Sequence, residues 1–192
     1  MIKKLLSCFV CLSIMVSCDQ LSKQVVSDEP IKSDIMGIEL CSITNCTAIE
    51  KAFTEETGTS FLAQQEEIGT GSFIRLLPLG FDVYYGGASW TYIDVLLDED
   101  SKVVYIAFVS SYESLDKAKK QFDMMREQLH QKYGKGNNQE EQFVLWTDNI
   151  NSVGIHYEES SSINGNDRCF CTMYYTNIAL SDAFDEANVP DI

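Results

Sequence analysis

The sequence predicts an α+β domain in two layers, with an antiparallel β-sheet and two amphipathic helices packed on one face of it. Residues 44–58 and 114–134 show the three- and four-residue apolar spacing that is typical of helices. The segments between and after them alternate apolar with polar residues and are joined by short polar turns, which favours antiparallel strands. Hydrophobic residues make up 45% of the 192 residues, so the chain can build a core.

The first helix is expected to begin between Thr44 and Thr47 and to end at Gly58. The second is expected to be capped by Ser114 and to end at Gly134. Its apolar residues form a single stripe: Leu115, Ala118, Phe122, Met125, Leu129 and Tyr133.

The clearest strand pair is a hairpin around a polar turn, in which Ile93, Val95 and Leu97 are expected to face the core. The expected strands are 73–79, 81–85, 90–97, 103–110, 143–147, 152–159 and 168–177.

The first 17 residues are typical of a signal peptide, because two lysines near the start precede a short apolar stretch and a small residue. The run Met15-Val16-Ser17-Cys18 resembles the lipobox of bacterial lipoproteins. That resemblance implies that Cys18 carries acyl chains, which anchor a protein to a membrane without spanning it. No apolar run reaches the roughly 18 residues of a spanning helix. The alternative to a lipoprotein signal is an ordinary secretory signal or an uncleaved anchor.

Four regions are expected along the chain. They are a signal peptide at 1–17, a lipidated cysteine with a flexible tether at 18–35, one domain at 36–180 and an acidic, frayed tail at 181–192. An added edge strand is the alternative for part of the tether. Loss of the leader changes the formal net charge from −15 to −17. Such a charge argues against nucleic acid as a partner and against a polybasic lipid-binding surface.

The order of segments resembles a group of small uncharacterised envelope lipoproteins of gut-type Gram-negative bacteria. The matching features are Gly37-Ile38-Glu39-Leu40, a helix, a hairpin and the helix end Lys132-Tyr133-Gly134. The order is also similar to the β-lactamase-inhibitor-protein-like fold. These resemblances imply a place in the cell envelope, with the outer membrane favoured over the inner, and carry over no functional residue.

Four cysteines remain after the leader and the lipidated cysteine: Cys41, Cys46, Cys169 and Cys171. An even number in an exported domain predicts disulfides, and we expect bridges from the first pair to the second pair. Buried thiols and a zinc site are the alternatives.

The sequence offers few groups for catalysis or metal binding. His130 is expected on the solvent side of the second helix, and His156 with Glu158 on one face of a strand, too few for a metal site. The turn Asp98-Glu99-Asp100 lacks the spacing of a calcium loop. We therefore predict no catalytic residue, metal or cofactor.

Aromatic residues gather near the expected strands, and Trp90, Tyr92 and Tyr84 are the candidates for an exposed binding face. Core packing is the alternative for these residues. The sequence thus favours a non-enzymatic lipoprotein that binds or assembles with a protein or a glycan. The alternatives are an inhibitor of an envelope or host enzyme and a hydrolase with an unrecognised site.

Overall fold

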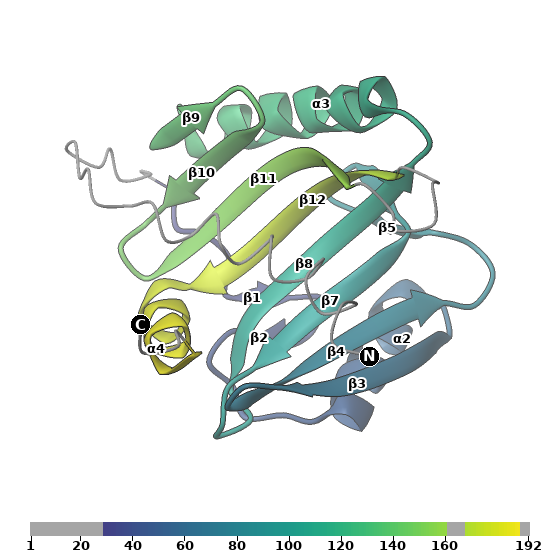
Figure 1. Cartoon of the computed structure of the whole chain (residues 1–192), viewed down its shortest axis with the longest axis vertical. Helices are drawn as coiled ribbons and strands as arrows, with labels where there is room; N and C mark the ends of the chain where they lie inside the picture. The colour runs from purple at the N-terminus through teal and green to yellow at the C-terminus, as the bar shows by residue number, and fades with distance from the viewer. Residues whose placement is uncertain (1–28, 161–167, 189–192) are drawn as a thin grey trace.

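The structure is a computed structural model that describes residues 29–160 and 168–188 (Figure 1). The signal peptide, Cys18 and most of the expected tether lie outside the described residues. The elements in chain order are β1 (Asp34–Ile35), β2 (Ile38–Glu39), α2 (Cys46–Thr57), β3 (Phe61–Ile68), β4 (Gly71–Pro78), β5 (Val83–Tyr85), β6 (Ala88–Trp90), β7 (Tyr92–Leu97), β8 (Val103–Tyr112), α3 (Leu115–Tyr133), β9 (Asn138–Glu140), β10 (Phe143–Thr147), β11 (Asn151–Ser160), β12 (Arg168–Asn177) and α4 (Ile178–Asn188).

The main sheet has eight strands in the order β3-β4-β7-β8-β12-β11-β10-β9, and every neighbouring pair is antiparallel. The pairs β1-β2 and β5-β6 form two small separate sheets. This arrangement confirms the α+β class. The hairpin β7-β8 was predicted, whereas β3 was not, because its outer half, Gln64 to Glu67, is polar on both faces and shows no apolar alternation.

Both predicted helices form. Helix α2 begins between Thr44 and Thr47, as predicted: Asn45 caps it, and its side-chain oxygen accepts a hydrogen bond from the Ala48 N–H at 3.0 Å. Gly58 ends α2 in the left-handed conformation, as expected for a helix stop. Helix α3 has Ser114 at its N-cap position and ends at Gly134, as predicted, but the Ser114 side chain makes no capping hydrogen bond. The helix contacts β11, β12 and β8 (Figure 1).

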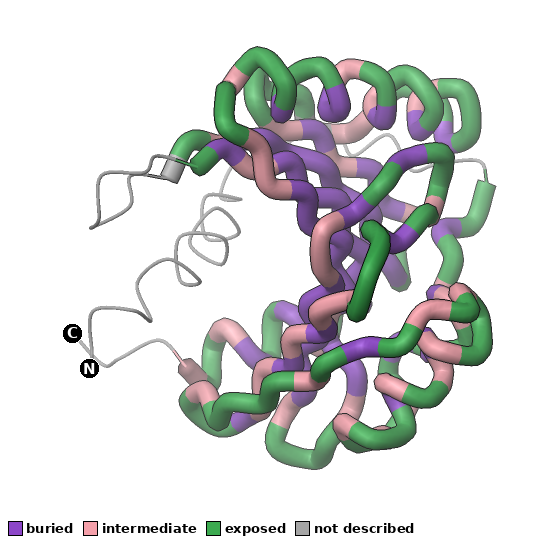
Figure 2. The backbone as a smooth tube through the Cα atoms, turned by 90° about the vertical axis from the view of Figure 1, so that its right-hand side faces the viewer, coloured by how far each residue is buried: buried purple, intermediate pink, exposed green. Residues whose placement is uncertain are grey.

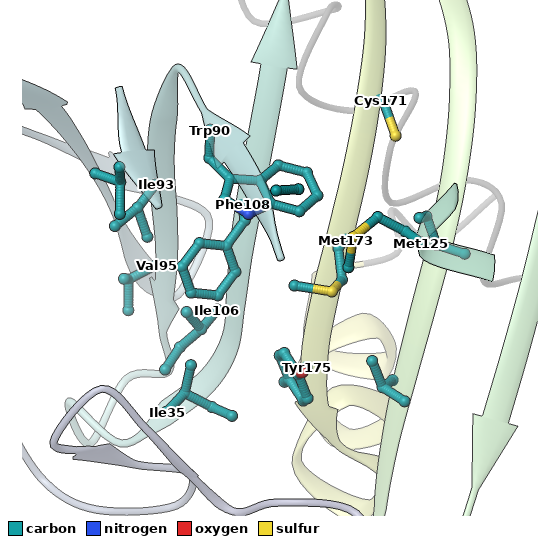
Figure 3. Packing of buried hydrophobic residues seen from close by; sticks show 14 of the residues in the cluster. Ile35, Trp90, Ile93, Val95, Ile106, Phe108, Met125, Cys171, Met173 and Tyr175 are labelled. Atoms are coloured by element: carbon teal, nitrogen blue, oxygen red, sulfur yellow. The ribbon is translucent and has the colours of Figure 1, made fainter. Parts of the chain in front are cut away.

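The largest core cluster joins one set of alternating strand residues to the buried residues of α2 and α3. Ile93, Val95 and Leu97 of β7 belong to it, as predicted, and so do Ile106 and Phe108 of β8. Figure 3 shows several of these side chains from close by. Buried stretches of backbone gather in the sheet, whereas the helices expose their outer turns (Figure 2).

The last residues of the predicted tether belong to the fold, because the chain joins the core before residue 36. Ile31 and Ile35 are buried in the core cluster, and the Ile31 N–H donates to a carboxylate oxygen of Asp148 at 2.6 Å. Ile35 pairs with Ile38 across the turn at Met36 and Gly37. The edge-strand alternative therefore describes residues 34–35 better than a flexible tether does.

The acidic tail is also not frayed up to residue 188, because it forms α4. The side chain of Asn177 accepts a hydrogen bond from the Leu180 N–H at 3.1 Å and so caps this helix. Phe184 is buried against Leu96 and Val104, which lie on the sheet face opposite to the large cluster. At the helix end, the side chain of Asn188 accepts a hydrogen bond from the Thr70 N–H at 3.0 Å. These contacts attach the helix to the sheet.

Candidate functional site

A second group of side chains lies on the sheet face opposite to the large cluster, because successive residues of a strand point to opposite faces. Ala107, Val109 and Tyr174 form its buried centre. Partly buried apolar residues from four strands pack around this centre: Tyr92, Tyr105, Phe143, Leu145 and Phe170. We call these eight residues the aromatic face. Four of the five surrounding residues carry aromatic rings that are partly exposed to solvent.

An ion pair lies at one side of the aromatic face. Arg75 and Asp94 are directly opposite each other on β4 and β7, and Nε and an Nη of Arg75 donate to the two oxygens of Asp94, both at 2.8 Å. The guanidinium also lies over the ring of Tyr92, 4.3 Å from its centroid. Because two hydrogen bonds fix the guanidinium plane, Arg75 in turn restricts the orientation of the Tyr92 ring.

The Asp94 carboxylate is poorly solvated in this pair. Its side chain is 10% exposed, whereas that of Arg75 is 30% exposed. Burial raises the pKa of Asp94, although the hydrogen bonds and charge of Arg75 act to lower it. The pair therefore carries a buried negative charge that depends on Arg75.

Tyr174 lies across the middle of the aromatic face because its neighbour on β11 has no side chain. A Cβ added to Gly154 would lie 2.3 Å from Cζ of the Tyr174 ring. The ring centroid of Tyr105 lies 5.5 Å from that of Tyr174, and the ring of His156 is 6.3 Å away on the other side. Gly154 thus lets the ring of Tyr174 lie close to the sheet backbone.

The three candidate binding residues from the sequence are not on one surface. Tyr92 lies on the aromatic face, where its side chain is partly exposed. Trp90 is wrong as a binding residue, because it is 0% exposed in the core and its indole N–H donates to the Tyr85 carbonyl at 2.9 Å. Its ring lies beside that of Phe108 (Figure 3). Tyr84 is 70% exposed, but it lies on the separate β5-β6 hairpin.

The prediction of disulfides is not fulfilled either: the four cysteines carry thiols in the structure. The Cys41 N–H donates to the Val103 carbonyl at the start of β8, whereas Cys169 pairs with Tyr112 at the end of that strand. Nine residues of strand separate these points by about 30 Å, far beyond the roughly 7 Å limit for the two Cα atoms of a disulfide. The alternative of buried thiols describes the pair on β12, Cys169 and Cys171.

Both histidines pack against aromatic side chains of the fold. His156 is buried on the aromatic-face side of β11, and burial lowers its pKa to about 4, so the imidazole is neutral at pH 7. His130 is not a plain surface residue, because its ring lies edge-on to Trp146 with centroids 5.3 Å apart. Within residues 29–160 and 168–188, no group of three or more His, Cys, Asp or Glu side chains could hold a metal ion.

Comparison with known proteins adds no relative. No protein-family model matches the chain, and no curated protein or solved structure is significantly similar to it. The resemblance to envelope lipoproteins therefore stays a prediction from the sequence. In the part of the chain that the structure describes, no helix is long and apolar enough to cross a membrane.

Proposed function

We propose that this protein is a lipid-anchored, non-enzymatic binding module of a bacterial cell envelope and that its aromatic face holds another protein. The observation that carries the proposal is the cluster of partly exposed rings from Tyr92, Tyr105, Phe143 and Phe170 around one buried centre. Aromatic residues and arginine are enriched where proteins bind each other, and they often carry most of the binding energy.

The proposal includes the finer architecture expected from the sequence, two layers with the two predicted helices on one face of the sheet. Helices α2 and α3 contribute to the large core cluster, and α4 meets the opposite face beside Leu96 and Val104. Among the described helices, none contributes a residue to the aromatic face. That part of the sheet is accordingly the surface that we propose for binding.

The ion pair prepares part of this surface before a partner arrives. The double hydrogen bond from Arg75 to Asp94 holds the guanidinium against the Tyr92 ring. Side chains that are already ordered lose less conformational entropy when a complex forms. We therefore expect Tyr92 to contribute more to binding than an equally exposed tyrosine without such contacts.

The test compares two tyrosines on different surfaces. Tyr92→Ala is expected to reduce the amount of cross-linked partner recovered with the protein from cells by about tenfold, the effect of roughly 1.4 kcal/mol in binding. Tyr84→Ala removes an exposed tyrosine from the β5-β6 hairpin and is expected to leave recovery unchanged. Circular dichroism of both variants checks that they are folded. Equal recovery with both variants would contradict the proposal.

A glycan partner is a separate outcome of the same experiment. Aromatic faces also bind sugars, so purified cell-wall polymer is added to the wild type and to Tyr92→Ala. Sedimentation of the wild type with the polymer, lost in the variant, would replace the protein partner with a glycan.

The anchor needs its own test, since Cys18 lies outside the described residues. Wild type and Cys18→Ala are compared for incorporation of radioactive palmitate and for sedimentation with membranes. The proposal predicts that both signals are lost in the variant. Proteinase K on intact cells then reports whether the domain faces outward or toward the periplasm. Unchanged fractionation of Cys18→Ala would contradict the lipid anchor and leave the binding face untouched.

A further inference from the structure

A pocket of about 220 Å³ lies on the other side of the sheet, between α3, β12, the β5-β6 turn and the segment before β1. Its inner wall is apolar and includes Met125 of α3 and Met173 of β12, which lie next to each other in Figure 3. Gly86 of the turn also lines it, and a Cβ there would lie 3.5 Å and 3.6 Å from the terminal methyl groups of these two methionines. The glycine thereby leaves space above the two methionine side chains.

Three phenol groups line the same pocket. The rings of Tyr85 and Tyr175 lie edge to face with their centroids 6.3 Å apart, and Tyr133 is close enough to affect the pKa of both. Burial raises the pKa of Tyr85 and of Tyr175, so both hydroxyls stay protonated at neutral pH and can donate hydrogen bonds.

The charge at the pocket is opposite to the charge of the chain. Two exposed lysines, Lys32 and Lys132, line it, and none of the acidic residues that the structure describes does, although the chain has 29 acidic residues. Asp34 lies near enough to Tyr85 to affect its pKa, but it does not line the pocket. Neither lysine forms an ion pair with a described residue.

Lys132 is held close to the phenols. Its Nζ donates to the Tyr133 hydroxyl at 2.8 Å, which uses one of its three N–H groups and leaves two for a ligand. An ammonium group and phenol hydroxyls together form a suitable set of donors for a carboxylate.

We infer that this pocket binds a small aromatic carboxylate, with the ring against Met125, Met173 and the tyrosines and the carboxylate toward Lys132 and Lys32. Aromatic rings and methionine sulfur make favourable contacts with a ligand ring. A cavity of about 150 Å³ binds benzene, so by proportion a volume of about 220 Å³ takes about nine non-hydrogen atoms. Benzoate has this size. This site is distinct from the aromatic face and does not depend on it.

The test uses the methionines themselves as reporters. After residue 28 the chain contains four of them, Met36, Met124, Met125 and Met173, and only the last two line the pocket. Purified full-length protein with ¹³C-labelled methionine methyl groups is titrated with sodium benzoate and followed by NMR. We expect the signals of Met125 and Met173 to shift in a saturable way, because a bound ring changes their magnetic surroundings. Met124, which is exposed next in sequence to Met125, is the internal control.

Charge is tested separately from shape. Benzamide, a neutral molecule of the same size, is expected to bind about tenfold more weakly than benzoate, which corresponds to one charge-assisted hydrogen bond. Lys132→Met is expected to weaken the binding of benzoate by a similar factor. The control is Lys120→Met, which replaces an exposed lysine of the same helix that does not line the pocket and is expected to leave benzoate binding unchanged.

Several outcomes would overturn the inference. They are no saturable shift at either buried methionine, equal affinity for benzoate and benzamide, or equal affinity in the two lysine variants. Tighter binding of hexanoate than of benzoate would overturn the aromatic specificity, because an alkyl chain would then fit the apolar wall of the pocket better than a ring does.

Discussion

Replacing Arg75 with methionine would test the ion pair that supports Tyr92. The variant leaves the Asp94 carboxylate without the guanidinium that donates two hydrogen bonds to it and balances its charge, at a side chain that is 10% exposed. Removing one partner of a buried pair costs about 3–5 kcal/mol. Since Arg75 itself is 30% exposed, water can solvate part of the Asp94 charge once Arg75 is gone. We therefore expect a loss in the free energy of unfolding at the lower end of this range, about 3 kcal/mol.

The stability lost in Arg75→Met should depend on pH. Burial already raises the pKa of Asp94 in the folded protein, and removal of Arg75 takes away the group that opposes this increase. The native state of the variant then holds a proton at pH values where the unfolded state, with a pKa of about 3.9, has released it. Its stability therefore falls as pH rises through this window and recovers in acid, so the deficit against the wild type is smaller at pH 5 than at pH 8.

Urea unfolding at both pH values measures this deficit. Lys102→Met is the matched control, because Lys102 and Asp100 are also 2.8 Å apart but are 35% and 65% exposed. An exposed pair contributes little to stability, because water solvates and screens both charges, so the control should lose little. A similar loss in both variants, or a loss at Arg75 that does not change with pH, would refute the argument that Asp94 carries a buried charge.

Three further changes test other parts of the structure. Trp90→Ala should lower the free energy of unfolding in urea by about 3–5 kcal/mol because it empties a fully buried site. A loss near zero would contradict the burial of Trp90. Gly154→Ala should destabilise the protein, since its Cβ would lie 2.3 Å from the Tyr174 ring, and Tyr174→Ala in the same chain should relieve the clash; no relief would show that the ring lies elsewhere. A reductant should leave the melting temperature unchanged because the four cysteines are thiols, and a fall of several degrees would indicate disulfides.

Much of the sheet could be predicted because its strands alternate. Ile93, Val95 and Leu97 face the core as their spacing indicates. Trp90 was placed on the wrong face because residues two apart share a face only within one continuous strand. A bend at Thr91 separates β6 from β7, so Trp90 joins the core and Tyr92 does not.

The last helix had a signal that could have been used. Asn177 is a good cap, and Leu180 and Phe184 are four residues apart, on one face of a helix. The prediction gave more weight to the acidic composition of this segment than to that pattern, and it was wrong for residues 181–188.

The two surfaces proposed for binding could not be predicted from local sequence. Arg75 and Asp94 are 19 residues apart and meet only because β4 and β7 pair in one register. The pocket likewise joins Lys32 to Lys132 through the packing of α3 on the sheet. Local spacing holds no information on such pairs, since they depend on how distant segments align.

Photo-cross-linking in the native bacterium tests the central proposal most directly. A benzophenone amino acid is placed at position 92 or 170 of the aromatic face, and at position 84 on the β5-β6 hairpin as the control. The proposal predicts that illumination yields one discrete adduct from positions 92 and 170 and none from 84. The same adducts from all three positions, or none from 92 and 170, would contradict the claim that the aromatic face holds a partner protein.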